Sequence, residues 1–100
     1  MTTSCKLRYL ARGVETDQES RQSLREELST VSGVACVTIL PVVEGWSIEV
    51  DFSDISPFGK SSFETYFAEQ ILKEAIMLRC KVDGALQLEL LLSSYEESTS

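Results

Sequence analysis

The chain has 100 residues, with 9 Lys and Arg against 16 Asp and Glu, a formal charge of −7, and neither His nor Asn. The negative charge disfavours binding to nucleic acid or anionic membrane surfaces, because both are bound through Lys and Arg. Without His or Asn, mechanisms that need an imidazole or an Asn carboxamide are excluded, so we do not expect an enzyme.

The first elements along the chain are a strand and a helix. Residues 6–12 alternate between apolar and polar side chains, which predicts a half-buried strand. Residues 16–19 have the form of a capping box and predict a helix over 17–31. Within that helix Asp17 and Arg21 have the i, i+4 spacing of a solvent-facing ion pair.

A hairpin is predicted next. Residues 34–40 are apolar on both faces and rich in β-branched side chains, which indicates a second strand. Residues 46–52 alternate cleanly and predict a third strand. Four side chains of this strand are expected to face the core: Trp46, Ile48, Val50 and Phe52.

The second half of the chain predicts one helix and one strand. A second capping box at 61–64 begins a helix over 62–80, and residues 85–92 form the last strand. The polar residues 95–100 are expected to be a frayed tail, which leaves one domain over 1–94. The apolar stripe of the helix comprises Phe63, Phe67, Ile71, Leu72, Ala75, Met77 and Leu78. The last strand is expected to turn Leu86, Leu88, Leu90 and Leu92 inward.

The order β-α-β-β-α-β predicts an α+β protein with the ferredoxin-like fold. In this fold two helices cover one face of a four-stranded antiparallel sheet. Right-handed connections place the first and third strands in the centre and the second and fourth strands at the edges.

One part of the sequence resembles a known family. Val31-Ser-Gly-Val-Ala-Cys-Val-Thr-Ile and Gly45-Trp-Ser-Ile-Glu-Val-Asp are similar to the middle of heavy-metal-associated domains. The resemblance covers about a quarter of the chain and implies the ferredoxin-like fold. Copper carriers of that family have Cys-x-x-Cys before the first helix, where this chain has Arg12-Gly-Val-Glu15. The resemblance therefore implies the fold without the metal function.

The cysteines and the N-terminus bear on cofactors and location. Cys5, Cys36 and Cys80 are odd in number and widely spaced, which predicts neither a disulfide framework nor a zinc site. We expect no metal and no cofactor. No apolar run is long enough for a membrane span, and the N-terminus lacks the apolar core of a signal peptide, so we expect a cytoplasmic protein.

Charged side chains are expected on the open face of the sheet, away from the helices. Lys6, Arg8 and Arg12 on the first strand should lie beside Glu49 and Asp51 on the third. The simplest interpretation is a solvated face with cross-strand ion pairs. The alternative is that Arg8 and Arg12 receive a carboxylate or phosphate of a partner.

The second strand is the main candidate for an interaction surface. An edge strand is normally protected by charge, Pro or a bulge, yet residues 34–40 carry no charge. Cys36, Thr38 and Leu40 are expected on its open side, in the same apolar surface as Leu10 and Leu91. We expect this surface to contact a partner protein or a second copy of the chain in a homodimer. The alternative is that a tail or loop covers the edge.

A further contact residue is Phe58, at the apolar tip of the loop 51–60. The leading functional hypothesis is a small cytoplasmic interaction or regulatory module that self-associates through 34–40. A second hypothesis is a ligand-binding or enzymatic ferredoxin-like dimer with a pocket between sheet and helices. A third is an acidic decoy or immunity-type protein that binds a basic partner.

Overall fold

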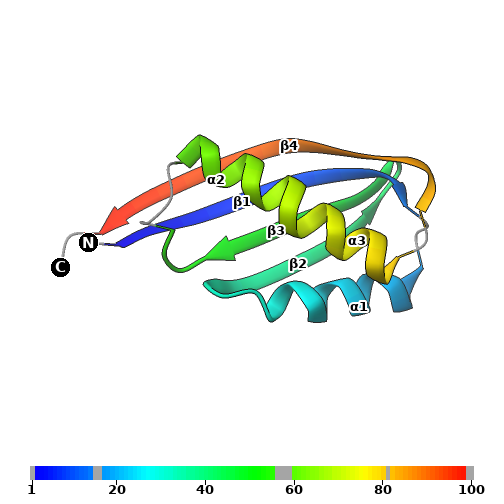
Figure 1. Ribbon diagram of the computed structural model, residues 1–100, viewed down its shortest axis with the longest axis horizontal. Helices are drawn as coiled ribbons and strands as arrows, with labels where there is room; N and C mark the ends of the chain where they lie inside the picture. Colours follow the sequence, from blue (N-terminus) through cyan, green and yellow to red (C-terminus); the bar gives the residue numbers. More distant parts are fainter. Residues whose placement is uncertain (1, 15–16, 56–59, 81, 99–100) are drawn as a thin grey trace.

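The computed structural model describes residues 2–14, 17–55, 60–80 and 82–98. Four antiparallel strands form one sheet in the order β2-β3-β1-β4, and the helices cover one of its faces (Figure 1). The elements in chain order are β1 (Thr2–Val14), α1 (Gln18–Ser29), β2 (Val34–Val42), β3 (Gly45–Phe52), α2 (Lys60–Tyr66), the π-helix η1 (Phe67–Leu72), α3 (Lys73–Arg79) and β4 (Val82–Ser98). The predicted α+β architecture with a four-stranded antiparallel sheet is confirmed.

The core lies between the sheet and the helices. The four predicted core residues of β3, from Trp46 to Phe52, are all buried, as are Leu7, Tyr9 and Ala11 of β1. The ring of Phe52 packs edge-on against Phe63 and Phe67, with ring centroids 4.8 and 5.0 Å apart. These aromatic contacts hold α2 and η1 against the central strands.

Helix α1 begins at a different cap from the predicted one. Asp17 is the N-cap, and its carboxylate accepts hydrogen bonds from the Glu19 N–H at 2.8 Å and the Ser20 hydroxyl at 2.9 Å. Thr16, the predicted cap, lies outside the described residues. Because Asp17 caps the backbone, the predicted ion pair with Arg21 does not form among the described residues.

The second helical region is one continuous run of α2, η1 and α3 (Figure 1). Ser61, the predicted cap, already lies inside α2, which begins at Lys60, so the second capping box is wrong. The middle of the run is π-helical, with hydrogen bonds that span one more residue than in an α-helix.

The π-helical turn changes which side chains face the core. Phe63 and Phe67 are buried four residues apart, but the next buried anchor, Leu72, follows after five. The extra residue shifts the apolar stripe along the chain, so Met77 and Leu78 are 61% and 72% exposed. Their predicted place in the core is wrong, because the prediction assumed a regular α-helix.

Strand β4 is longer than the predicted strand 85–92. It pairs with β1 as far as Ser98, opposite Thr2, so residues 95–98 are not a frayed tail. The N-terminal half of β1 needs a hydrogen-bonding neighbour on this side, and the last residues of β4 supply it. Residues 99–100 lie outside the described residues.

A β-bulge interrupts β4 at Leu91. Arg8 lies opposite Leu92 and Tyr9 lies opposite Leu90, so Leu91 is an extra residue between the two pairs. The bulge reverses the alternation beyond this point. Leu92 therefore lies on the open face with Arg8, and its predicted inward orientation is wrong.

Candidate functional site

The open face of the sheet carries cross-strand ion pairs on its central strands. Lys6 lies opposite Asp51 and Arg8 lies opposite Glu49. The Arg8 guanidinium contacts the Glu49 carboxylate at 2.8 Å, and the Lys6 ammonium lies 4.0 Å from the Asp51 carboxylate. These pairs confirm the predicted solvated face. Arg8 already has a carboxylate partner within the sheet.

Arg12 pairs with different carboxylates from the predicted ones. It lies opposite Gly45, and its guanidinium contacts Glu44 of the hairpin at 2.9 Å and Glu89 of β4 at 3.3 Å. The hydrogen bond with Glu44 is the main cause that raises the pKa of Arg12 above its ordinary value. Arg12 therefore links the β2–β3 hairpin to the edge strand β4, and its guanidinium is already bound by two carboxylates of the protein.

The predicted surface residues on β2 are exposed, whereas Leu10 is not. Cys36, Thr38 and Leu40 are exposed on β2, and Leu40 is 57% exposed. Leu10 lies on the open face of the central strand β1 but is only 8% exposed. It stands between the long side chains of Arg8 and Arg12 on the same face. Leu10 is therefore not available to a partner, which corrects the prediction.

The remaining predicted contacts do not join β2 in one patch. Leu91 is 51% exposed but belongs to β4, and two strands separate β4 from β2. With strands spaced about 4.8 Å apart, the two edges lie about 14 Å apart. The predicted single apolar surface is therefore wrong. Phe58 lies outside the described residues.

The backbone of β2 presents hydrogen-bonding groups along the open edge. Pro41 lies opposite Trp46 within the strand. Because Pro has no N–H, a paired strand tolerates it where its nitrogen faces away from the neighbour. By alternation the backbone groups of Ile39 and Val37 also face outward. A bulge at Ala35 and Pro41 thus bound a short, uncharged stretch of open edge.

A groove lies where α1 adjoins the edge of β2, a feature that the sequence analysis missed. Its volume is about 270 Å³, and it is lined by Gln18, Arg21, Gln22 and Arg25 of α1 and by Ile39 of β2. Among the described residues, neither arginine forms an ion pair. The Nε atom of Arg21 is buried and has no hydrogen-bond partner there. This groove is the basic part of the candidate site.

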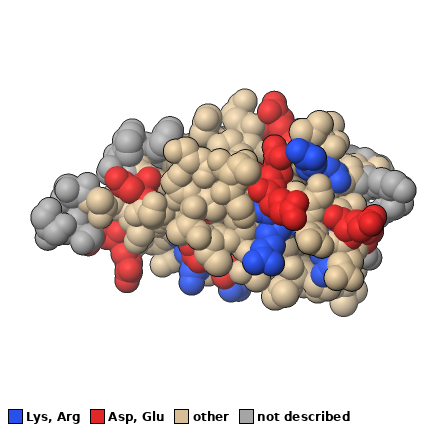
Figure 2. All heavy atoms as spheres, turned by 90° about the horizontal axis from the view of Figure 1, so that it is seen from below, with Lys and Arg blue, Asp and Glu red and all other residues tan. Residues whose placement is uncertain are grey.

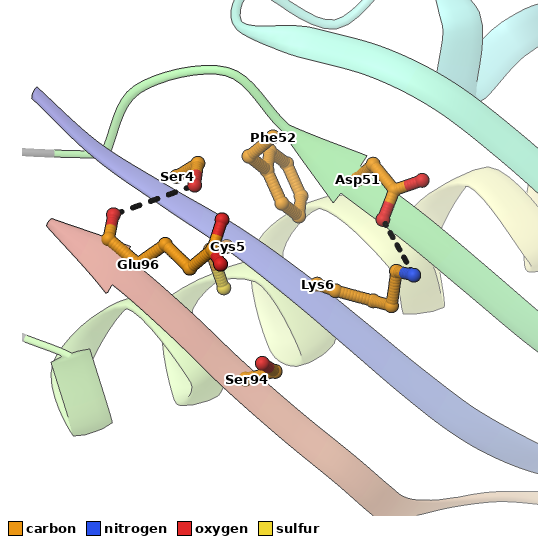
Figure 3. A pocket seen from close by; sticks show the side chains of 7 residues that line it. All are labelled: Ser4, Cys5, Lys6, Asp51, Phe52, Ser94 and Glu96. Atoms are coloured by element: carbon orange, nitrogen blue, oxygen red, sulfur yellow. Dashed lines mark hydrogen bonds and ion pairs between the residues drawn. The ribbon is translucent and has the colours of Figure 1, made fainter. Parts of the chain in front are cut away.

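A second depression, of about 390 Å³, lies on the open face near the paired chain ends (Figure 3). Its polar side chains interact with one another, since Lys6 pairs with Asp51 and the Ser4 hydroxyl donates to the Glu96 carbonyl at 3.4 Å. The other lining residues are Cys5, Phe52 and Ser94. The polar groups of the depression are therefore less available to a ligand than Arg21 and Arg25 of the groove beside β2, which form no ion pair with a described residue.

A half-buried polar cluster joins β1 and β4 to α2. The Tyr95 hydroxyl donates to the Glu64 carboxylate, and the Tyr9 hydroxyl donates to the Glu64 carbonyl at 3.0 Å.

Burial raises the pKa of Cys5 to about 11, and burial likewise raises the pKa of Cys80 to about 11. At neutral pH both are therefore protonated thiols, which are poor nucleophiles.

The expected pocket between sheet and helices is occupied by side chains. Trp46, Phe67 and Ile76 are fully buried in that space. Within the described ranges, no three Cys, Asp or Glu side chains gather as a metal site. No helix in the described part of the chain is long and apolar enough to cross a membrane.

The charge is mixed on the face that carries α1. Seen from below, acidic and basic side chains are interspersed around a broad uncharged area (Figure 2). The formal charge of −7 therefore does not form a single acidic block on this face.

Comparison with known proteins gives little to transfer. No family model matches the sequence, and no curated protein matches it. Among solved structures, the crystal structure of a conserved protein from Methanosarcina mazei Go1 is similar with a TM-score of 0.46 and 15% sequence identity. The match covers 91% of this chain and 92% of that one. A similarity of this size indicates neither the fold nor the function of this chain.

Proposed function

We propose that this chain is a small protein-interaction module with the ferredoxin-like fold, and that it binds an extended strand of a partner along β2. The element order β-α-β-β-α-β and the central position of β1 and β3 support this fold. The resemblance to heavy-metal-associated domains is consistent with the same topology.

The observation that carries the proposal is the uncharged open edge of β2. Val37 and Ile39 direct their backbone groups outward between the bulge at Ala35 and Pro41. An added strand satisfies such groups by main-chain hydrogen bonds. The side chains of Thr38 and Leu40 are exposed on the open face beside that edge, where they would contact alternate side chains of the partner strand.

Crosslinking from the edge tests this proposal. A photoreactive residue in place of Thr38 is expected to crosslink a partner protein in the native cell. The same residue in place of Ser94, which is exposed on the opposite edge strand, is the matched control. In a separate pull-down with purified protein as bait, the variant Thr38→Lys should no longer recover the partner identified by crosslinking. The variant Ser94→Lys should still recover it.

Equal crosslinking from the two edges would contradict the proposal. Circular dichroism and thermal unfolding of both lysine variants establish that they are folded. Crosslinking from Ser94 alone would place the interaction at β4 instead of β2.

A further inference from the structure

We infer that the strand bound by β2 is acidic: an extended peptide whose carboxylates are held by Arg21 and Arg25 in the groove between α1 and β2. This inference rests on the proposed function and specifies the chemical class of the partner. It depends on charge complementarity, on spacing and on the unpaired state of the two arginines.

The groove lies beside the edge at which a partner strand would pair. Helix α1 runs alongside β2 (Figure 1), and Arg21 and Arg25 line the groove together with Ile39. The backbone of Ile39 faces outward, so a strand paired there would run directly below the two arginines. Side chains on the helix side of that strand would enter the groove.

The two arginines differ from the other cations of the sheet and helices. Arg8 and Arg12 contact carboxylates at 2.8 and 2.9 Å, and Arg79 contacts Glu27 at 2.9 Å. Arg21 and Arg25 form no ion pair within residues 2–14, 17–55, 60–80 and 82–98. The protein has 16 acidic residues against 9 basic ones, yet these neighbouring cations form no ion pair with any carboxylate that the structure describes.

Arg21 also loses nothing by turning toward a ligand. Its Nε atom is buried with no hydrogen-bond partner among the described residues, and a buried donor in that state is unfavourable. A carboxylate in the groove would give the guanidinium a planar, bidentate partner. No ion pair with a described residue has to break first.

The spacing of the arginines fits an extended chain. Residues four apart on an α-helix are separated by about 6 Å along its axis. Side chains on one face of a strand repeat every two residues, about 7 Å apart. Two acidic residues separated by one residue would therefore face Arg21 and Arg25 together.

The same charges disfavour a second copy of the chain as the partner. Symmetric pairing of β2 with β2 would place α1 of both copies on the same face across the twofold axis. Arg21 and Arg25 of one copy would then approach the same arginines of the other, and juxtaposed like charges oppose association. The groove therefore favours an acidic peptide over the self-association expected from the sequence.

Two labelled synthetic peptides test the inference with the full chain. One alternates Glu with Val and the other alternates Gln with Val, both flanked by Thr. We expect the Glu peptide to bind about ten-fold more tightly than the Gln peptide at low salt, because it forms two partly exposed ion pairs. Added NaCl should reduce this difference.

Variants locate the effect on the two arginines. Arg21→Gln/Arg25→Gln should bind the two peptides equally. Lys6→Gln/Arg79→Gln removes the same charge from residues that already pair with carboxylates, so it should retain the preference. Chemical-shift changes at the Val37 and Ile39 amides should report the pairing of either peptide with β2.

The outcomes separate the inference from the proposed function. Equal binding of both peptides to the unchanged protein at the β2 amides would overturn the inference and leave the function standing. Binding of neither peptide would overturn both. A stable dimer that is lost in Thr38→Lys and is not displaced by the Glu peptide would identify a second copy as the occupant, which also overturns the inference.

Discussion

The two edges of the sheet are protected in different ways. Strand β4 has 17 residues, pairs with β1 except at 83–86 and at Leu91, and carries Glu89, Glu96 and Glu97 on its exposed surface. Strand β2 has 9 residues and no charge, and its protection is a bulge at one end and Pro41 at the other. Carboxylates protect the β4 edge at Glu89 and at Glu96 and Glu97, whereas a bulge and a proline protect the two ends of β2.

This difference shows that an edge strand must be judged by its backbone as well as by its side chains. The carboxylates of β4 oppose pairing with any acidic strand, including a second β4. The uncharged centre of β2 has no such repulsion, and Arg21 and Arg25 of α1 line the groove beside it. An acidic strand is therefore disfavoured at the β4 carboxylates and favoured beside β2.

The largest expected effect comes from a core residue that supports both edges. Phe67 is fully buried and contacts Phe52 and Tyr9 on the central strands. Phe67→Ala should lower the free energy of unfolding by about 3–5 kcal/mol, measured by urea denaturation, because it leaves a cavity. Amide exchange should accelerate in β2 and β4 together. Acceleration in one edge alone would show that the edges unfold separately.

The matched control for this substitution lies further along the same helical run. Met77 is 61% exposed, so Met77→Ala should change the free energy of unfolding by less than about 0.5 kcal/mol. A loss as large as that of Phe67→Ala would contradict the shift of the apolar stripe at η1.

Alkaline pH should have an intermediate effect, to which Cys5, opposite Tyr95 in the β1–β4 pair, contributes. Burial raises the pKa of Cys5 from 9.0 to about 11 in the folded protein. The unfolded chain therefore releases this proton at lower pH. The stabilisation is complete below pH 9.0 and is lost as the pH rises toward about 11. The urea midpoint should fall across this range.

Cys5→Ala separates this contribution from the other thiols. The variant should show a shallower decline of the urea midpoint with pH, because one of the groups with a raised pKa has been removed. The decline that remains is expected from Cys80, whose pKa is also about 11, and above pH 10.0 from Tyr9 and Tyr95, whose pKa values are likewise raised by burial. An unchanged slope in Cys5→Ala would contradict the assignment to the β1–β4 side.

The smallest effect concerns the ion pairs between the edges. Arg8→Gln should lower the free energy of unfolding by about 0.5 kcal/mol, since exposed ion pairs contribute little. Lys6→Gln should cost less, because its contact with Asp51 is 4.0 Å against 2.8 Å for Arg8 and Glu49. Arg8→Gln also leaves Glu49 unpaired beside β2, so it should weaken binding of the acidic peptide slightly. Stronger binding would contradict the electrostatic contrast between the edges.

The central strands were the most predictable part of the fold. One face of β1 and β3 packs on helices and the other meets water, so their side chains alternate in the sequence, with Leu10 as an apolar exception on the open face. Trp46 and Ile48 are buried, and the opposed pairs Lys6–Asp51 and Arg8–Glu49 follow from the same alternation. When one face of a strand is buried and the other is exposed to water, the alternation of apolar and polar residues indicates which side chains face the core.

The irregular elements were not predictable by alternation or helical spacing. Both patterns assume a constant residue count per repeat, and the bulge at Leu91 and the π-helical turn each add one residue. The five-residue gap between the buried Phe67 and Leu72 was hidden in the sequence, because Ile71 offers an apolar side chain at the regular four-residue spacing. The last residues of β4 were missed because polar composition resembles that of a free tail.

The candidate site was predicted in part. The exposure of Thr38 and Leu40 was predicted by placing alternate side chains of the strand 34–40 on its open side. The burial of Leu10 was not predicted, because it depends on how the long side chains of Arg8 and Arg12 lie on either side of it. The groove was missed because Arg21 was assigned to Asp17, whose carboxylate instead caps the helix. The Asp17 carboxylate could bind either Arg21 or the free N–H groups at the start of α1, and the backbone geometry at the helix N-terminus favours the second.

The π-helical turn also affects how this chain should be aligned with any relative. A related helix without the extra residue would match this one only if a gap is placed within Phe67–Leu72. An ungapped alignment would equate Met77 and Leu78 with buried positions of the relative and misplace every residue as far as Arg79. Sequence divergence would then be overestimated in the segment where the two cores in fact correspond.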